Sequence, residues 1–193
     1  INRIKRKDIN WISGHPIAGS EVSGPLNGNE NLFVNKWSVI IKQKKSRTEE
    51  MKKILKFWKL LGSKTVIMEA DQHDKIFAIT SHLPHLIAYN LILTATNFKN
   101  LNKKNILKFS AGGLRDFSRI AASNEIMWRD IFFNNKTNML KAIDLFTKNL
   151  KIFKHDIKND RNNLEVKLRK LKKVRQKIIL LKQDTSEPDF GRI

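Results

Sequence analysis

Side chains able to do chemistry are concentrated in three short segments, and the first of these carries His15, in GHPIAGS. Pro16 excludes the preceding residue from helical backbone, so His15 is expected to be extended, directly after a short strand over Asp8–Ile12, with glycines on either side. At the carboxyl end of a strand in an α/β sheet, an imidazole faces the crevice in which ligands bind. The alternative is a turn in which His15 is merely exposed to solvent.

The second segment is SHLPH, which contains His82 and His85. Three residues apart in a helix, the two imidazoles project from neighbouring positions on one face. Pro84 has no N–H, so the carbonyl of Thr80 loses its helical partner and the helix is expected to kink there. Buried imidazoles need partners, and three kinds stay open: core carbonyls, a ligand or a metal. The metalloprotease pattern, with its Glu and its different spacing, is absent.

The third segment, AGGLRDFSRI, places two arginines after a pair of glycines that ends at Gly113. The glycines permit close approach of the backbone, and Arg115 and Arg119, four residues apart, share one helix face. This spacing indicates a carboxylate-binding site, and the alternative is a pair of surface ion pairs. Further along, Trp128 combines a large ring with a polar N–H, which suits an interface or the wall of a pocket.

These segments surround a predicted helix over Asp71–Thr96. Between Lys75 and Lys99 the sequence has no Lys, Arg, Asp or Glu, although 29% of the chain is charged. Such an uncharged run predicts a helix that is surrounded by protein on most sides. It is long enough to cross a membrane, but its His, Pro, Asn, Ser and Thr residues would be costly in lipid, so no membrane partner is expected.

The residues before this helix predict the end of an α/β sheet. Strands are expected over Lys36–Lys42 and Lys64–Met68. Between them, a capping box is expected to begin a helix at Ser46 that runs to about Leu61 and is closed by Gly62. No Gly-x-Gly-x-x-Gly occurs in the chain, so the phosphate-binding half of any dinucleotide site is expected to lie outside it.

The residues after the central helix are predicted to be mainly helical. From Asn138 onward, apolar residues recur every three or four positions with basic residues between them, which predicts a helix pair, or one long helix, broken at Asn159–Asp160. The expected apolar seam consists of Met139, Ile143, Phe146, Leu150, Phe153, Ile157, Leu164, Leu168, Leu171, Ile178 and Leu181. Residues 184–193 are expected to form a loose tail.

The composition is that of a basic globular protein. The net charge is +20, 40% of the residues are hydrophobic, and the absence of Cys excludes disulfide and thiolate chemistry. Lys outnumbers Arg and is spread over every polar face, and no nucleic-acid-binding motif accompanies the charge, so no specific nucleic-acid partner is expected. The basic N-terminal residues are not followed by an apolar signal core, and a cytoplasmic location is expected.

Taken together and in this order, GHPIAGSE, HD followed by TSHLPH, and AGGLRDFSRIAASNEIMWRDIF resemble the prephenate/arogenate dehydrogenase family of tyrosine biosynthesis. The resemblance implies a mainly α fold, in which the end of a Rossmann-type α/β domain (residues 1–70) is followed by an all-helical dimerisation domain (71–183) and the tail (184–193). It also implies a homodimer, a small-molecule substrate, and NAD or NADP as cofactor. The family reaction is the oxidative decarboxylation of prephenate to 4-hydroxyphenylpyruvate, driven by aromatisation of the ring.

The resemblance also implies roles for individual residues. His15 is expected to be the catalytic residue that accepts a hydrogen bond from the ring hydroxyl and helps to withdraw its proton, which requires a neutral imidazole. Arg119 is expected to bind a substrate carboxylate, and His85 to line the side-chain end of the substrate. The further candidates for substrate binding are Ser81, Gly113, Arg115, Trp128 and Glu21. Ser20 is the candidate for cofactor binding, and no metal is expected.

Three of these candidates carry more specific expectations. Glu21 is expected to gate the site by ion pairing, and Trp128 to reach the pocket of the partner subunit. Arg115 stands where the family often has Lys.

Two other functions stay open: a catalytically inactive dimerisation fragment, because the chain lacks the phosphate-binding half, and a basic helical nucleic-acid-binding protein. The sequence discriminates neither prephenate from arogenate nor NAD from NADP.

Overall fold

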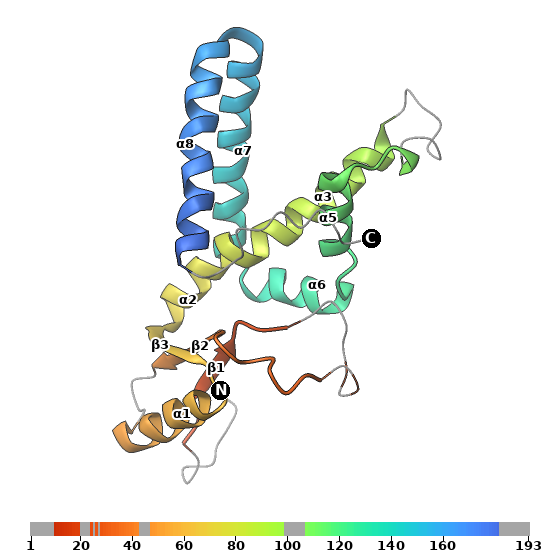
Figure 1. The fold of residues 1–193 in the computed structure, drawn as a ribbon. Coiled ribbons are helices and arrows are strands. Elements are labelled where there is room, and N and C mark those ends of the chain that lie inside the picture. Colours follow the sequence, from red (N-terminus) through yellow and green to blue (C-terminus); the bar gives the residue numbers. More distant parts are fainter. Residues whose placement is uncertain are drawn as a thin grey trace.

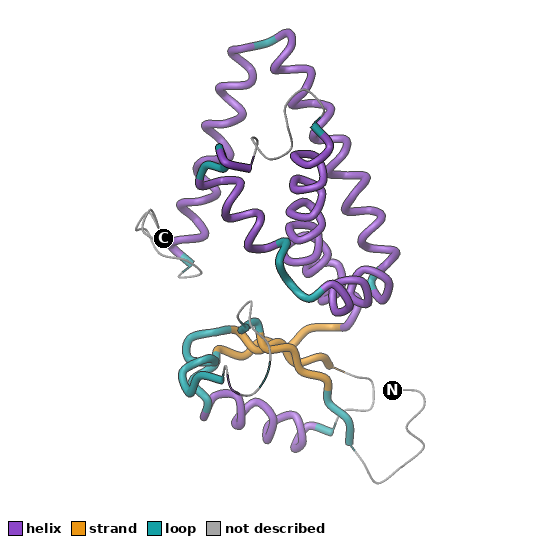
Figure 2. The backbone as a smooth tube through the Cα atoms, turned by 90° about the vertical axis from the view of Figure 1, so that its right-hand side faces the viewer, coloured by secondary structure: helices purple, strands orange, loops and turns teal. Residues whose placement is uncertain are grey.

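The computed structural model describes residues 10–19, 24, 26, 28–42, 47–98 and 107–181. A small sheet with one helix forms one end of the molecule, and a set of helices forms the rest (Figures 1 and 2). The last strand of the sheet runs directly into the first helix of the helical part. The expected fold class, mainly α with the end of an α/β domain followed by a helical domain, is confirmed.

The sheet consists of β1 (Ser13–Pro16), β2 (Trp37–Lys42) and β3 (Lys64–Glu69), in the order β1-β2-β3. The central strand, β2, pairs antiparallel with β1 and parallel with β3. Buried Val39 and Ile41 of β2 form a core cluster with Phe77, which belongs to the helical part. This apolar contact fixes the helical part against the sheet.

The first strand lies further along the chain than predicted. It was expected over Asp8–Ile12, but it spans Ser13–Pro16, and residues 1–9 lie outside the described part of the chain. Pro16 can close this strand because β1 is at the edge of the sheet, where a missing N–H costs no ladder bond to a further strand. His15 therefore lies within the strand, opposite Val39 of β2, and not after it.

Helix α1 (Thr48–Leu60) connects the two parallel strands, as predicted. Its N-cap is Arg47, whose side chain makes no capping hydrogen bond, so the predicted start at Ser46 was wrong; Ser46 itself lies outside the described residues. Gly62 closes the helix with φ +78°, and a Cβ there would lie 3.3 Å from Cα of Val34. Both the left-handed backbone and the close approach require glycine at this position.

The predicted central helix is present as α2 (Ala70–Phe77), the π-helical turn η2 (Ala78–His82) and α3 (Leu83–Asn97). In the π turn, Leu83 N–H donates to the carbonyl of Ala78, five residues earlier. The turn lies directly before Pro84, which cannot donate a hydrogen bond to the preceding turn. The irregularity predicted around Pro84 therefore takes the form of a π turn, a feature that is common at functional sites.

The expectation that this helix is surrounded by protein was wrong for the single chain. By length and composition alone it could cross a membrane, and only 17% of its most apolar window is buried. Its exposed apolar side chains are Ile76, Ile79, Leu91 and Leu93. An apolar sequence shows that a face avoids water, but it does not show whether the same chain or a second molecule covers that face.

The remaining described helices are α5 (Gly112–Ile120), α6 (Glu125–Asn134), α7 (Lys136–Asn159) and α8 (Arg161–Leu180). Helices α7 and α8 form a long hairpin that projects from the molecule (Figure 1). The predicted break at Asn159–Asp160 is confirmed. Asp160 caps α8, since its side chain accepts a hydrogen bond from the backbone N–H of Asn163 at 2.9 Å.

The predicted apolar seam of this hairpin is only partly correct. Met139 is buried, but Leu150 is exposed and Ile157 is 71% exposed. The position between the helices near their tip is occupied by Asp156, which is buried and paired with Lys167. Two helices bury only one narrow stripe between them, and because a polar pair fills part of that stripe, several predicted seam residues face outward.

Asp156 is expected to make the pairing of α7 with α8 depend on pH. The hydrogen bond from Lys167 and its charge hold the pKa of the carboxyl below its usual range, against an opposing effect of burial. Because the lower pKa belongs to the folded state, the stabilisation is complete above about pH 3.9 and is lost as the pH falls through the folded pKa. Thermal denaturation followed by circular dichroism should show a steeper acid loss in the parent than in Asp156→Asn; equal slopes would contradict this role.

Candidate active site

A cavity of about 1040 Å³ lies where the sheet meets the helical part. One wall comes from β1 and the residues that follow it, and the others come from the α2–α3 helix and from α5, α6 and the segments beside them. The predicted site residues that line it are His15, Ser81, His85, Arg119 and Trp128. Residues that are far apart in the sequence therefore meet at one place, and their individual roles stay predictions.

His15 enters the cavity from the sheet. Its ring is half-buried and lies against Phe77 and His73, with ring centroids 4.8 and 5.0 Å away. Burial lowers the pKa of His15, and the positive charge that His73 carries when it is protonated lowers it further. Both effects favour the neutral imidazole, which can accept a proton.

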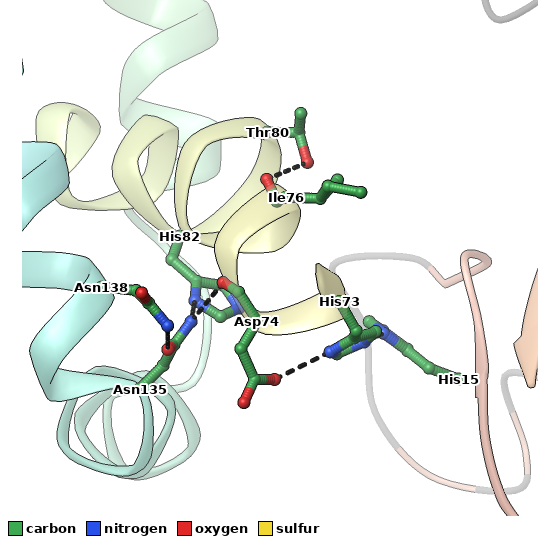
Figure 3. A network of polar contacts seen from close by, with 8 residues as sticks. All are labelled: His15, His73, Asp74, Ile76, Thr80, His82, Asn135 and Asn138. Atoms are coloured by element: carbon green, nitrogen blue, oxygen red, sulfur yellow. Dashed lines mark hydrogen bonds and ion pairs between the residues drawn. The ribbon is translucent and has the colours of Figure 1, made fainter. Parts of the chain in front are cut away.

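His73 and Asp74 are the main site residues that the sequence analysis missed. Nε2 of His73 lies 2.8 Å from Nδ1 of His15, and Nδ1 of His73 lies 2.9 Å from Oδ1 of Asp74 (Figure 3). The available signal was the dipeptide His-Asp at the start of the central helix. It entered the family resemblance as a motif, but it suggested no partner, because a separation of 58 positions in the sequence hides the contact between His15 and His73.

The π turn and the first turn of α3 place His82 and His85 in the cavity wall. Nδ1 of His85 donates to the carbonyl of Ser81 at 2.9 Å, so Nε2 is the nitrogen left for a ligand. Burial lowers the pKa of His85, and the bond to Ser81 partly opposes the shift. The pKa of His82 is also lowered, chiefly by burial. Of the three kinds of partner that the sequence left open, His85 has a backbone carbonyl, and both histidines also line a cavity that could hold a ligand.

Asn135 ties this wall to α7 and was also missed. Its side-chain N–H group donates to the carbonyl of Asp74 at 2.8 Å and lies 3.3 Å from Nδ1 of His82 (Figure 3). Asn138 in turn donates to the side-chain carbonyl of Asn135. The buried amide therefore fixes α2, η2 and α7 relative to one another. Because a surface Asn and a buried one look alike in a sequence, no pattern indicated this contact.

Trp128 forms the floor of the histidine side of the cavity. Its ring is stacked on His85, with centroids 3.6 Å apart and planes at 21°, and only 5% of the residue is exposed. Among the described residues its indole N–H has no hydrogen-bond partner. Helix α6 positions the ring, and its N-cap, Asn124, accepts a hydrogen bond from the backbone of Met127 at 2.8 Å. In this chain Trp128 contacts its own cavity; a contact with a partner subunit stays a prediction.

Only one of the two arginines of α5 lies at the cavity. Arg119 lines the cavity, whereas Arg115 and Gly113 are not among its lining residues. The two side chains share a helix face, as predicted, but Arg115 lies a full turn, about 6 Å, further along the axis. Arg119 is near the end of α5 next to Ser123, whose carbonyl accepts a hydrogen bond from Tyr89 at 3.0 Å. This bond ties the end of α5 to α3.

Two predicted site residues, Ser20 and Glu21, lie outside the described residues. Across the part of the chain that the structure describes, no group of three His, Cys, Asp or Glu side chains is arranged to hold a metal ion. Within that part, the cavity offers imidazoles, one guanidinium, the carboxylates of Asp74 and Asp130 and the amides of Asn134 and Asn135 for recognition of an organic ligand.

The fold and the site first define a class: the end of an α/β sheet, a helical domain and a histidine-lined cavity at their junction are the arrangement of a two-domain protein whose ligand site lies between the domains. Comparison with known families agrees. Residues 1–67 match the family described as prephenate dehydrogenase, nucleotide-binding domain, and residues 69–173 match prephenate dehydrogenase, dimerization domain. The chain belongs to the prephenate dehydrogenase family, and the resemblance drawn from its sequence motifs is confirmed.

Individual relatives carry related names. The chain is 34% identical over 140 residues to the cyclohexadienyl dehydrogenase of Zymomonas mobilis, covering 72% of this chain and 48% of the relative. It is 32% identical over 169 residues to the prephenate dehydrogenase of Lactococcus lactis, covering 87% and 46%. A crystal structure of prephenate dehydrogenase from Aquifex aeolicus in complex with hydroxyphenyl propionate and NAD+ superposes with a TM-score of 0.81 at 36% identity, covering 86% and 58%. The chain thus spans about half the length of the curated relatives.

Proposed function

We propose that this chain supplies the substrate side of the active site of an NAD(P)-dependent dehydrogenase that oxidatively decarboxylates prephenate or arogenate in tyrosine biosynthesis. The observation that carries the proposal is the single cavity that brings His15 from the sheet together with His85, Arg119 and Trp128 from the helical part. The named relatives support it, because they are dehydrogenases of these cyclohexadienyl substrates.

The proposed chemistry assigns the proton to His15. The hydroxyl group on the ring of the substrate gives its proton to the imidazole, and the ring carboxylate leaves as carbon dioxide as the ring becomes aromatic. The imidazolium then returns the proton to the ring oxygen, which becomes the hydroxyl of the aromatic product. When bound, NAD(P)+ would supply the acceptor for the hydride, which leaves the ring carbon that bears the hydroxyl. The lowered pKa of His15 supports this role, because only the neutral imidazole can take the proton.

The remaining residues are proposed to hold the substrate. Arg119 binds a carboxylate through charge-assisted hydrogen bonds. His85 lines the end that carries the substrate side chain, with Ser81 orienting its ring and Trp128 stacked behind it. Gating by Glu21 stays part of the proposal.

The cavity also fits a cofactor ring beside the substrate. Its volume of about 1040 Å³ is at the upper end of the range for small-molecule sites, roughly 300–1,000 Å³. The wall that follows β1 is built from Ile17, Ala18 and Gly19, and among the described residues no atom lies within 4 Å of the place where a Cβ of residue 19 would stand. The small residues Ala18 and Gly19 would leave room for a nicotinamide close to His15, with Ser20 next in the chain. NAD and NADP both stay open.

The test uses a form of the protein that carries a complete nucleotide-binding domain. Formation of reduced nicotinamide is followed by absorbance with prephenate or arogenate as substrate and with NAD+ or NADP+ as acceptor, and release of carbon dioxide is measured alongside. Turnover with one of the four combinations supports the proposal and identifies the substrate. Cofactor and substrate binding without turnover would support an inactive dimerisation protein instead.

We also propose that the helical part forms a homodimer, located in the cytoplasm. The exposed large apolar side chains of α2–α3 and the exposed leucines of α7 and α8 support it, because large apolar side chains exposed in numbers are typical of an interaction surface. Light scattering at micromolar concentration should therefore give twice the monomer mass. Leu93→Asp, which puts a charge among these side chains, should shift the population toward monomer. A monodisperse parent monomer, or recovery only in detergent, would contradict the dimer.

A further inference from the structure

His73 lies between the proposed base and a carboxylate. Nδ1 of His15 is 2.8 Å from Nε2 of His73, and Nδ1 of His73 is 2.9 Å from Oδ1 of Asp74. The His73 ring packs on Phe77 with centroids 4.5 Å apart, and the His15 ring packs on the same Phe77. These ring contacts fix both imidazoles, and the three polar side chains form one continuous chain of hydrogen bonds, of which Figure 3 shows the bond between His73 and Asp74.

The contact between the two histidines has the geometry of a hydrogen bond and not of a shared metal. A zinc ion lies about 2.0–2.1 Å from each of its nitrogen ligands and needs space between them. The facing nitrogens of His15 and His73 are 2.8 Å apart, which is hydrogen-bond distance and leaves no such space. A proton therefore lies between the two rings, and its position depends on their tautomers.

The carboxylate determines those tautomers. The charged side chain of Asp74 can only accept a hydrogen bond, so Nδ1 of His73 must carry the proton that it donates. In the neutral ring of His73, Nε2 is then a lone pair, and it must receive its hydrogen bond from Nδ1–H of His15. This leaves the lone pair of His15 on Nε2. With the opposite tautomers, Nε2 of His15 would carry a proton and could not accept another one.

We propose that His73, held by Asp74, is a positioning residue that fixes His15 in the Nδ1–H tautomer, with the lone pair of Nε2 available for the proton of the substrate hydroxyl. This inference rests on the proposed role of His15 as the base. The logic is that of an Asp-His-nucleophile triad, in which the third group sets the tautomer of the imidazole. Here a second imidazole stands between the carboxylate and the base.

The same chain stabilises the product of the proton transfer. The proton leaves the hydroxyl oxygen for Nε2 of His15, and the resulting imidazolium keeps its Nδ1–H bond to His73. Asp74 then places a negative charge two hydrogen bonds away, which favours the cation. Its side chain is 51% exposed, so solvent weakens this effect, and it is expected to be smaller than the effect of the tautomer itself. The other titratable or charged side chains in the cavity wall are His82, His85, Arg119 and Asp130.

The kinetic test compares three substitutions in the protein with a complete nucleotide-binding domain. His73→Phe keeps a ring against Phe77 but removes the acceptor, and it should lower kcat by roughly tenfold to a hundredfold with KM within about twofold, less than the loss of the base itself. His73→Gln retains a carbonyl that can accept from Nδ1–H of His15, so it should recover most of the lost rate. Asp74→Asn should cost only a few-fold, because its amide oxygen can still accept. His155→Phe, an exposed histidine on α7, is the matched control and should be unchanged.

A direct readout is the ¹⁵N NMR signal of the His15 ring, which distinguishes the two neutral tautomers without substrate or cofactor. The parent and His73→Gln should show the Nδ1–H form, and His73→Phe should shift toward the Nε2–H form. A parent in the Nε2–H form, or kcat and tautomer unchanged in His73→Phe, would overturn the proposal while leaving His15 as the base. Full turnover in His15→Asn would instead overturn the proposed function. If His73→Phe fails to fold, the parent spectrum and His73→Gln still decide.

Discussion

Replacing His15 by Asn should lower kcat by about a hundredfold or more while the substrate still binds, because general-base catalysis contributes roughly 10²–10⁴-fold. Asn keeps a polar group of similar reach in the strand but has no lone pair of suitable basicity. The KM should therefore stay within a few-fold of the parent value. The measurement needs the complete nucleotide-binding domain, and His155→Asn on the exposed side of α7 is the control for loss of an imidazole.

The pH profile should identify the titrating group. Protonated His15 cannot accept the hydroxyl proton, so kcat/KM should fall on the acidic side. Because burial and the charge of His73 lower the pKa of His15, this limb should lie below the ordinary histidine value of about 6.5. The limb should vanish in His15→Asn. Full turnover with the limb intact would make His15 a structural residue of the strand, and His85 would become the next candidate for the base.

The sequence predicted those parts of the fold that depend on local chemistry. The restriction that Pro16 imposes on His15, the end of α1 at Gly62 and the break at Asn159–Asp160 each depend on a few neighbouring residues, and each is present in the structure. The family resemblance then joined the segments into one site. Element boundaries were less accurate: β1 begins five residues later than expected, and α1 begins after Arg47 and not at Ser46.

The parts that the sequence did not predict depend on contacts between distant residues. His73 meets His15 only because Phe77 packs on the sheet and brings the start of α2 against β1. The exposure of the central helix shows the same limit, since an uncharged run is apolar whether its own chain or another covers it. Arg115 and Arg119 were equivalent by helical spacing, and only the position of the cavity, which Arg119 lines and Arg115 does not, distinguishes them.

Because Arg119 lines the cavity and Arg115 does not, Arg119→Ala should raise KM by roughly tenfold to a hundredfold. A hydrogen bond to a charged group contributes about 1.5–3 kcal/mol, and about 1.4 kcal/mol corresponds to a factor of ten. Arg115→Ala, one turn along the same helix, should change KM by less than about twofold. Arg169→Ala on α8, whose guanidinium pairs with Glu165, tests for a general effect of lost charge. Equal rises for both α5 arginines would show that the carboxylate binds between them, as their spacing alone suggested.

The split between KM and kcat in Arg119→Ala should also show which carboxylate the guanidinium holds. A side-chain carboxylate keeps its charge throughout the reaction, so losing its partner weakens ground state and transition state equally and leaves kcat unchanged. The ring carboxylate loses its charge as carbon dioxide departs, so an arginine there binds the ground state more tightly than the transition state. In that case Arg119→Ala should raise KM and also raise kcat. A fall in kcat at unchanged KM would contradict both assignments and place Arg119 at a charge that develops only during the reaction.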